Sequence, residues 1–119
     1  MIVDPAWRDE TMKVVISGDR IVRMSKQISR DDFSATYIGI TVVRAAAHAR
    51  LFNRIEELIR GGDRQVFFNA AVQQLADEGL HVAYSETGGL PWAEIDDPGD
   101  LSFARLNVFP QLARIPAAA

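Results

Sequence analysis

Near the N-terminus, apolar residues, many of them β-branched, are concentrated in two short runs, KVVIS at 13–17 and IVRMSK at 21–26. Gly18 and Asp19 lie between them, and a Gly-Asp pair is typical of a two-residue hairpin turn. We therefore predict a β-hairpin. The next run, TYIGITVV at 36–43, is nearly continuous in apolar and β-branched residues, as in a strand that is covered on both faces. It predicts a central strand.

The middle of the chain changes to helical spacing. Apolar residues recur on one face between Ala45 and Arg60, and Gly61-Gly62 supplies a left-handed cap; these apolar residues are Ala47, Leu51, Ile55, Leu58 and Ile59. A second helix is expected to begin with Asp63 as N-cap and to end at Gly79. The residues it should bury are Phe67, Ala71, Val72 and Leu75.

The last third of the chain predicts shorter elements. His81 to Tyr84 alternates as a short strand, and Gly88-Gly89 predicts a turn. Trp92 to Asp96 then predicts a last strand segment. Asp97 to Val108 predicts a last helix, which Pro110 should end.

These elements follow the order ββ-β-α-α-β-β-α, which predicts an α/β fold: a partial three-layer sandwich with a mixed sheet. At 119 residues and 48% hydrophobic composition, the chain has the usual size of one domain, so we expect a single domain over 1–119. Residues 110–119 have no periodic pattern left and are expected to fray. The chain opens with a hairpin instead of the strand-helix-strand start of a nucleotide-binding half. We therefore expect it to be the second half of a larger fold.

Composition limits which kinds of partner the chain can be expected to bind and in which cellular compartment it is expected to lie. Thirteen basic and sixteen acidic residues give a formal net charge of -3, without a Lys/Arg run, so no nucleic-acid partner is expected. The chain has no cysteine, which excludes a thiolate metal site and fits a cytoplasmic protein. No apolar stretch approaches the roughly 20 residues of a membrane span, so we expect a soluble chain without a membrane partner.

The main chemical candidate is the acidic segment PWAEIDDPGDL at 91–101. Two of its carboxylates have a structural explanation. Asp97 precedes Pro98 and is a typical N-cap, and Asp100 falls in the first helical turn, where the helix dipole favours negative charge.

The other two carboxylates, Glu94 and Asp96, precede the cap and alternate with Ile95. In an extended segment they would point to the same side and repel each other, and a cation would relieve that repulsion. Mg²⁺ takes one or two protein carboxylates together with substrate phosphates, so Asp96 would suit phosphoryl or nucleotidyl chemistry. A plain solvated surface remains the alternative.

Other residues offer weaker candidates. His48 and His81 lack further ligands at metal spacing, which favours structural roles. Lys26 ends a strand, where it could bind a phosphate or be simply solvated. The sequence contains no GxSxG motif and no phosphate-binding loop.

Four ordered segments, DPAWRDETMKVVI, GDRIVRMSK, YIGITVV and PWAEIDDPGDLSFAR, resemble the C-terminal half of nucleotidyltransferases of the sugar-nucleotide type. The likeness is closest to phosphocholine and related alcohol-phosphate cytidylyltransferases, and it extends from about Val3 to Arg105. Its most specific element is Trp92-x-Glu94-Ile95-Asp96, followed by Asp100-Leu101 and Ala104.

The resemblance implies a reaction. In such enzymes a glycine-rich loop of the N-terminal half binds an NTP, and a phosphorylated acceptor attacks its α-phosphate in line. Mg²⁺ is held by one aspartate from each half, and Asp96 would be the second of these and a catalytic residue.

The resemblance also implies further site residues. Lys26 would be a second catalytic residue, near the acceptor or product phosphate, and Trp92 and Glu94 would lie beside the acceptor group. Tyr37 and Gly39 would also belong to the substrate site, with Gly39 where the backbone approaches the ligand.

The chain differs from the family in that it lacks the N-terminal half, which carries the glycine-rich loop and the first metal aspartate. We therefore expect an acceptor-binding and metal-binding half that is inactive alone and that holds Mg²⁺ only when the missing half is present. With the other half it would transfer a nucleotidyl group from an NTP, CTP by resemblance, to a phosphorylated alcohol or sugar. The alternative is a non-catalytic dimerisation or regulatory domain that retains the fold. A homodimer is expected in either case, because a missing half leaves a sheet edge and an apolar face uncovered.

Overall fold

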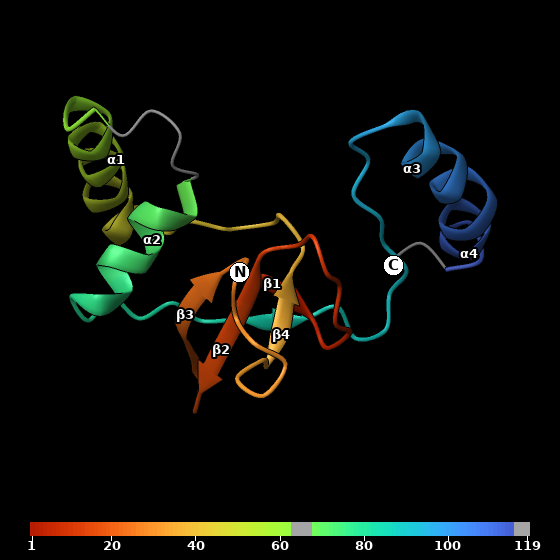
Figure 1. Cartoon of the computed structure of the whole chain (residues 1–119), viewed down its shortest axis with the longest axis horizontal. Coiled ribbons are helices and arrows are strands. Elements are labelled where there is room, and N and C mark those ends of the chain that lie inside the picture. The colour runs from red at the N-terminus through yellow and green to blue at the C-terminus, as the bar shows by residue number, and fades with distance from the viewer. Residues whose placement is uncertain (63–67, 116–119) are drawn as a thin grey trace. The chain divides into compact units, whose positions relative to one another are not determined.

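The computed structural model describes residues 1–62 and 68–115 (Figure 1). The chain divides into two compact units, residues 1–86 and residues 87–119. The first unit contains a five-stranded sheet and two helices, and the second contains a helical run. The predicted α/β class with a mixed sheet is confirmed.

The sheet of the first unit has the strand order β3-β2-β4-β1-β5. Its β1–β5 pair is parallel, and its other three pairs are antiparallel. The strands are β1 (Ile2–Asp4), β2 (Lys13–Ser17), β3 (Arg20–Ser25), β4 (Ala35–Tyr37) and β5 (Ser85–Glu86).

The predicted hairpin is confirmed as β2 and β3. Ser17 pairs with Arg20 across the two-residue turn, and Gly18 has a φ of 62° there, a left-handed conformation that suits glycine. Val14 is fully buried and Ile21 is 2% exposed, so the hairpin contributes directly to the core.

The predicted strand at 36–43 is central, because β4 lies between β2 and β1, but its predicted length is wrong. Regular pairing ends at Tyr37, and Gly39 turns the chain with a φ of 88°. Ile2 still pairs irregularly with this stretch, accepting from the Ile38 N–H and donating to the Ile40 carbonyl. Val42 beyond it is 80% exposed, so an apolar run alone did not indicate burial here.

The short strands at the other side of the sheet differ from expectation. The pattern did not predict β1, which lies between β4 and β5. The strand predicted at 81–84 is wrong: Ala83 makes only an isolated bridge with Arg20, and β5 starts at Ser85. Both strands are too short for a periodic signal and form through pairing with distant segments, β1 with β4 and β5, and β5 with β1.

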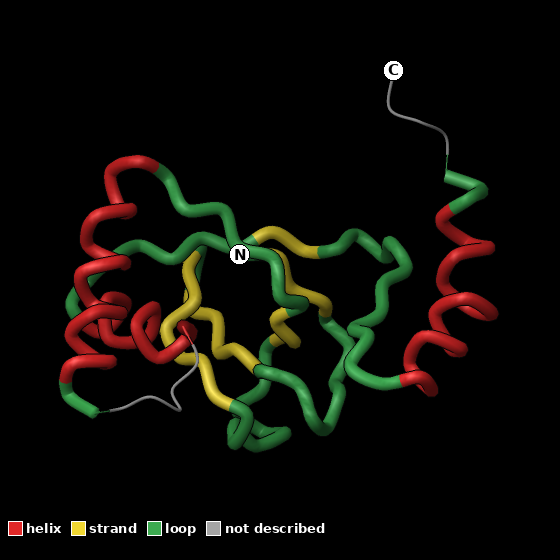
Figure 2. Tube along the Cα trace, turned by 90° about the horizontal axis from the view of Figure 1, so that it is seen from above, coloured by secondary structure: helices red, strands yellow, loops and turns green. Residues whose placement is uncertain are grey.

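Helix α1 (Ala45–Arg60) has the predicted bounds, and α2 (Phe68–Asp77) lies within the second predicted helix. Ala71, Val72 and Leu75 of α2 are buried as predicted. Asp63 and Phe67, expected as N-cap and buried residue, lie outside the described residues. Figure 2 shows α1 and α2 together at one side of the strands, and α2 contacts both α1 and β3.

Two sets of hydrogen bonds fix α2, one at its C-terminus and one between its Gln73 side chain and β3. Its C-terminus closes as a Schellman motif, in which the Gly79 N–H bonds the Ala76 carbonyl and the Leu80 N–H bonds the Leu75 carbonyl. The Gln73 amide bonds the backbone of β3, accepting from the Met24 N–H at 2.6 Å and donating to the Val22 carbonyl at 3.2 Å. It thereby satisfies backbone groups on an edge strand of the sheet.

The second unit is helical. Its elements are α3 (Pro98–Phe103), the π-helical turn η1 (Ala104–Val108) and α4 (Phe109–Leu112). The strand predicted at 92–96 is wrong, because these residues adopt no strand and the described part of this unit has none to pair with them. The observed order therefore differs from ββ-β-α-α-β-β-α, with four strands before the first helix.

Pro110 does not end the last helix, contrary to expectation. Proline lacks an N–H and crowds the preceding turn, and the chain accommodates it with η1, where the Phe109 N–H bonds the Ala104 carbonyl five residues earlier. Helical structure therefore continues to Leu112, and the expected fraying of residues 110–119 stays a prediction. Residues 116–119 lie outside the described residues. Among the helices described here, none has the length and apolar character needed to cross a membrane.

Candidate functional site

The acidic segment forms a reciprocal helix cap. The Asp97 carboxylate accepts from the backbone N–H groups of Gly99 at 2.6 Å and Asp100 at 3.0 Å. The Asp100 carboxylate in turn accepts from the N–H groups of Asp97 at 3.1 Å and Asp96 at 3.0 Å. This is a capping box, so Asp97 and Asp100 have the structural roles that the sequence predicted.

Asp96 has a different position in the same segment. Its backbone is held by Asp100, but its carboxylate is exposed and takes no part in the cap. Glu94 is exposed as well. Because the segment is not a strand, the alternation of Glu94 and Asp96 does not by itself place their carboxylates on one side.

A complete metal centre is not present in the described part of the chain, where no three His, Asp or Glu side chains are grouped closely enough to hold an ion. Asp96 alone fits a different kind of site, in which Mg²⁺ keeps water and substrate-phosphate ligands beside one or two carboxylates. The half-buried indole of Trp92 lies four residues before it in the same unit.

The three remaining predicted site residues lie in the first unit. Lys26 is exposed just past the end of β3. The Tyr37 side chain is buried in β4, and its hydroxyl lies 2.8 Å from the Thr41 hydroxyl. Burial raises the pKa of Tyr37, and the hydrogen bond with Thr41 acts in the opposite direction.

Gly39 follows β4 with a φ of 88°, and a side chain there would meet open space. Its backbone conformation is therefore sufficient to explain the glycine. The approach of a ligand to Gly39 stays a prediction, as does any meeting of the first-unit residues with Trp92, Glu94 and Asp96.

A buried lysine was missed by the sequence reasoning. Lys13 is 1% exposed, and its Nζ donates to the carbonyls of Asp9 at 2.7 Å, Thr11 at 3.2 Å and Lys26 at 3.1 Å. The ammonium also lies 4.7 Å from the ring centroid of Trp7. These contacts use all three donors of the ammonium and join the loop before β2 to the end of β3. The only signal in the sequence is a lysine that opens an apolar strand.

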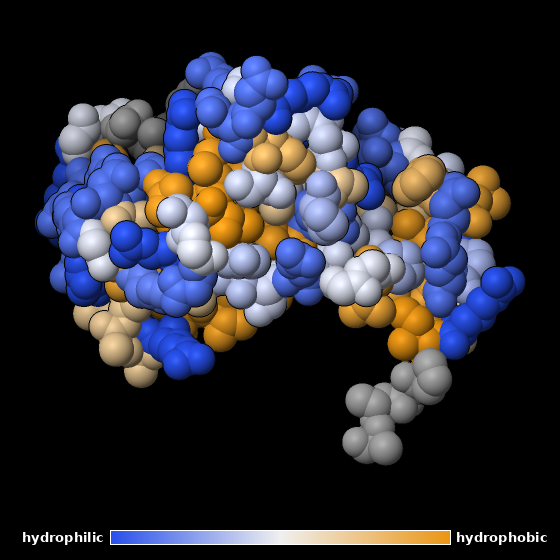
Figure 3. Space-filling model, turned by 90° about the horizontal axis from the view of Figure 1, so that it is seen from below, coloured by the Kyte–Doolittle hydropathy of each residue, from blue (hydrophilic) through white to orange (hydrophobic). Residues whose placement is uncertain are grey.

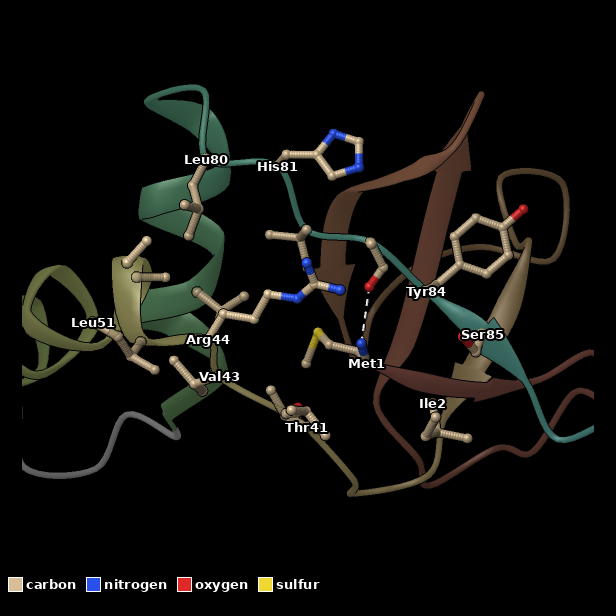
Figure 4. Close-up of a pocket in the computed structure, with 16 residues that line it drawn as sticks. Met1, Ile2, Thr41, Val43, Arg44, Leu51, Leu80, His81, Tyr84 and Ser85 are labelled. Carbon is tan, nitrogen blue, oxygen red and sulfur yellow. Dashed lines mark hydrogen bonds between the residues drawn. The ribbon is translucent and has the colours of Figure 1, made fainter.

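The first unit also contains a pocket of about 440 Å³ that the sequence reasoning did not predict. Figure 4 shows the residues that line it: the strand end at Met1 and Ile2, the segment 41–47 that leads into α1, and the segment 80–85 after α2, together with Leu51 of α1 and Val72 of α2. The Met1 amino nitrogen donates to the Ala83 carbonyl at 2.8 Å across this pocket, and partial burial lowers the pKa of that amino group.

Of the two histidines, only His81 lines the pocket, and its Nε2 lies 3.7 Å from the Asp19 carboxylate. His48 packs its ring against Phe52 at a centroid distance of 4.5 Å. Comparison with protein-family models and with curated proteins finds no match to this chain.

Proposed function

We propose that this chain provides the acceptor-binding and metal-binding half of a nucleotidyltransferase. One observation carries the proposal: the capping box uses Asp97 and Asp100, which leaves the Asp96 carboxylate exposed at a position that its backbone hydrogen bond holds. An acidic segment that only began a helix would not need this residue. Asp96 is also the residue that the resemblance to nucleotidyltransferases places on the metal.

The proposed reaction joins a phosphorylated alcohol or sugar to a nucleotide. A phosphate oxygen of the acceptor forms a bond to the α-phosphorus of the NTP, and the bond from that phosphorus to the bridging oxygen breaks, releasing pyrophosphate. When bound, Mg²⁺ supplies neutralisation of the phosphate charge. Asp96 would hold it, Trp92 and Glu94 would contact the acceptor group, and Lys26 would neutralise a phosphate.

The proposal requires a nucleotide-binding half, because the sequence has no loop whose backbone amides could bind a triphosphate. CTP remains the expected donor by resemblance, and the chain alone is expected to be inactive. Transfer is therefore measured on the chain joined to a nucleotide-binding half, with CTP and a panel of phosphorylated alcohols and sugar phosphates.

Metal binding is tested on the same joined chain, because the resemblance implies Mg²⁺ only when the nucleotide-binding half is present. Mn²⁺ replaces Mg²⁺ and broadens the amide NMR signals of nearby residues, so broadening is expected around 92–100. Asp96→Asn should abolish it. Asp97→Asn is the matched control, because it removes the same charge from the adjacent position while asparagine still caps the helix. Equal loss in both variants would indicate a diffuse acidic surface and contradict the assignment.

The alternative, a non-catalytic dimerisation or regulatory domain, is supported by a separate observation. Large apolar residues of the helical run are exposed, among them Leu106 at 77% and Phe109 at 68%, and Figure 3 shows hydrophobic surface on this run. Such surface favours association with a second copy. The homodimer stays a prediction under both functions.

A further inference from the structure

The pocket of the first unit combines apolar walls with one cationic side chain. Its walls include Val43, Leu51, Val72, Leu80 and Val82, and none of the described residues that line it is acidic. A volume of about 440 Å³ lies within the range of small-molecule sites, roughly 300–1,000 Å³. Its walls therefore suit the apolar body of a small organic molecule.

Arg44 provides the polar recognition. Figure 4 shows its side chain extending over the middle of the pocket, between Met1 and the segment that contains Leu80 and His81. Among the described residues, no carboxylate or carbonyl binds its guanidinium, and it makes no capping bond to the helix that it precedes. By contrast, Arg54 on the same helix pairs with Glu57 at 2.9 Å and Glu78 at 2.7 Å.

The charges around the pocket indicate a monovalent ligand. His81 lies beside Asp19, which offsets its charge when it is protonated. Burial lowers the pKa of the Met1 amino group, and one of its donors is already used by the Ala83 carbonyl. Arg44 is thus the one described lining residue whose charge is permanent and has no opposite charge beside it. A guanidinium matches a carboxylate with two parallel hydrogen bonds, whereas a phosphate monoester dianion would call for a second cation.

We propose that this pocket binds a small organic carboxylate, with the carboxylate on the Arg44 guanidinium and the aliphatic body against Leu51, Val72 and Val82. The first turn of α1 also lines the pocket, and its positive dipole end adds to the attraction for an anion. This site is separate from the phosphorylated acceptor and from Asp96.

The test is a titration of the whole chain with hexanoate, followed by amide NMR. Signals of residues 41–47 and 80–85 are expected to shift in a saturable way. Acetate lacks the apolar body, hexanol lacks the charge, and both should bind at least about tenfold more weakly. Hexyl phosphate tests the preference for a single charge and should also bind more weakly than hexanoate.

Three variants separate this site from general charge attraction. Arg44→Gln should weaken hexanoate binding about tenfold or more. Arg50→Gln is the matched control, since it removes the same charge from an exposed position of α1 outside the pocket, and it should bind as the wild type does. Ala46→Phe should block the pocket from an exposed lining position.

Absence of hexanoate binding to the wild type, or equal binding in Arg44→Gln, overturns the proposal. Hexanol or hexyl phosphate binding as tightly as hexanoate also overturns it. These readouts involve neither Mn²⁺ nor nucleotidyl transfer, so they are independent of the assignment of Asp96.

Discussion

The hairpin at 13–25 and the segment at 92–96 have similar strand-like patterns but adopt different structures. In the hairpin, Gly18 returns the chain within two residues, so β2 and β3 pair locally and bury Val14 and Ile21. The segment has no ladder partner in the described part of its unit, and Ile95 is 53% exposed. A strand-like pattern therefore shows that a segment can be a strand, and the availability of a partner decides whether it becomes one.

Polar residues in the two regions differ as well. Beside the hairpin, the Lys13 ammonium is buried and makes three hydrogen bonds to carbonyls. In the acidic segment, Glu94, Asp96 and Asp97 stay exposed, Asp100 is half-buried, and Asp97 and Asp100 cap a helix. The first arrangement stabilises a tertiary contact, whereas the second stabilises one helix end and leaves Asp96 available.

The largest expected difference in stability is between shortening an isoleucine of the hairpin, Ile21, and shortening one of the acidic segment, Ile95. Ile21→Ala should lower the free energy of unfolding of the first unit by about 2–5 kcal/mol, because it leaves a cavity in the core. Ile95→Ala should change stability by less than about 0.5 kcal/mol, because its side chain is already half-exposed. Urea unfolding of the two variants measures the difference. Equal destabilisation would show that the acidic segment is packed as firmly as the hairpin.

A smaller effect is expected at the helix cap. Asp97→Ala removes the acceptor for two N–H groups and should destabilise the helical run by about 0.5–2 kcal/mol. Asp96→Ala leaves the cap intact and should have little effect. Amide hydrogen exchange at 98–112 measures this local stability. Faster exchange in Asp96→Ala to the same degree would assign its carboxylate to the cap and remove support for a metal role.

The smallest expected effect is on the stability of the sheet at alkaline pH, where the buried Tyr37 titrates. Because burial raises its pKa above 10.0, the folded chain holds the phenol proton more tightly than the unfolded chain does. Its contribution to stability is complete below pH 10 and is lost as the pH rises through the raised pKa. Tyr37→Phe should remove this alkaline loss while costing about 1 kcal/mol at neutral pH through the lost bond with Thr41.

Tyr84→Phe provides the control, because the chain has two tyrosines and this variant leaves only Tyr37 to titrate. Its ultraviolet absorbance titration should give a pKa above the ordinary value. A titration at the ordinary value would mean that Tyr37 is open to solvent, which would favour the substrate role that the resemblance implies.

Local features of this protein were determined by the sequence itself. The bounds of α1, the hairpin turn and the Asp97 cap all agree with prediction. Each depends on residues within four or five positions of one another, through helical periodicity, a two-residue turn or a side chain that reaches the next N–H groups. The sequence also set Glu94 and Asp96 apart from the two carboxylates of the cap, and the metal role of Asp96 came from the resemblance.

Tertiary structure alone decided the rest. Strand β5 exists because it pairs with a segment more than 80 residues away, with Ile2 opposite Ser85, and β1 also pairs with β4, with Val3 opposite Tyr37. The burial of Lys13 required three carbonyls from two separate loops, and the pocket around Arg44 required the N-terminal strand, both helices and the segments beside them to meet. A local sequence pattern cannot predict these long-range contacts. The free energy that stabilises them arises only when both segments have been brought together.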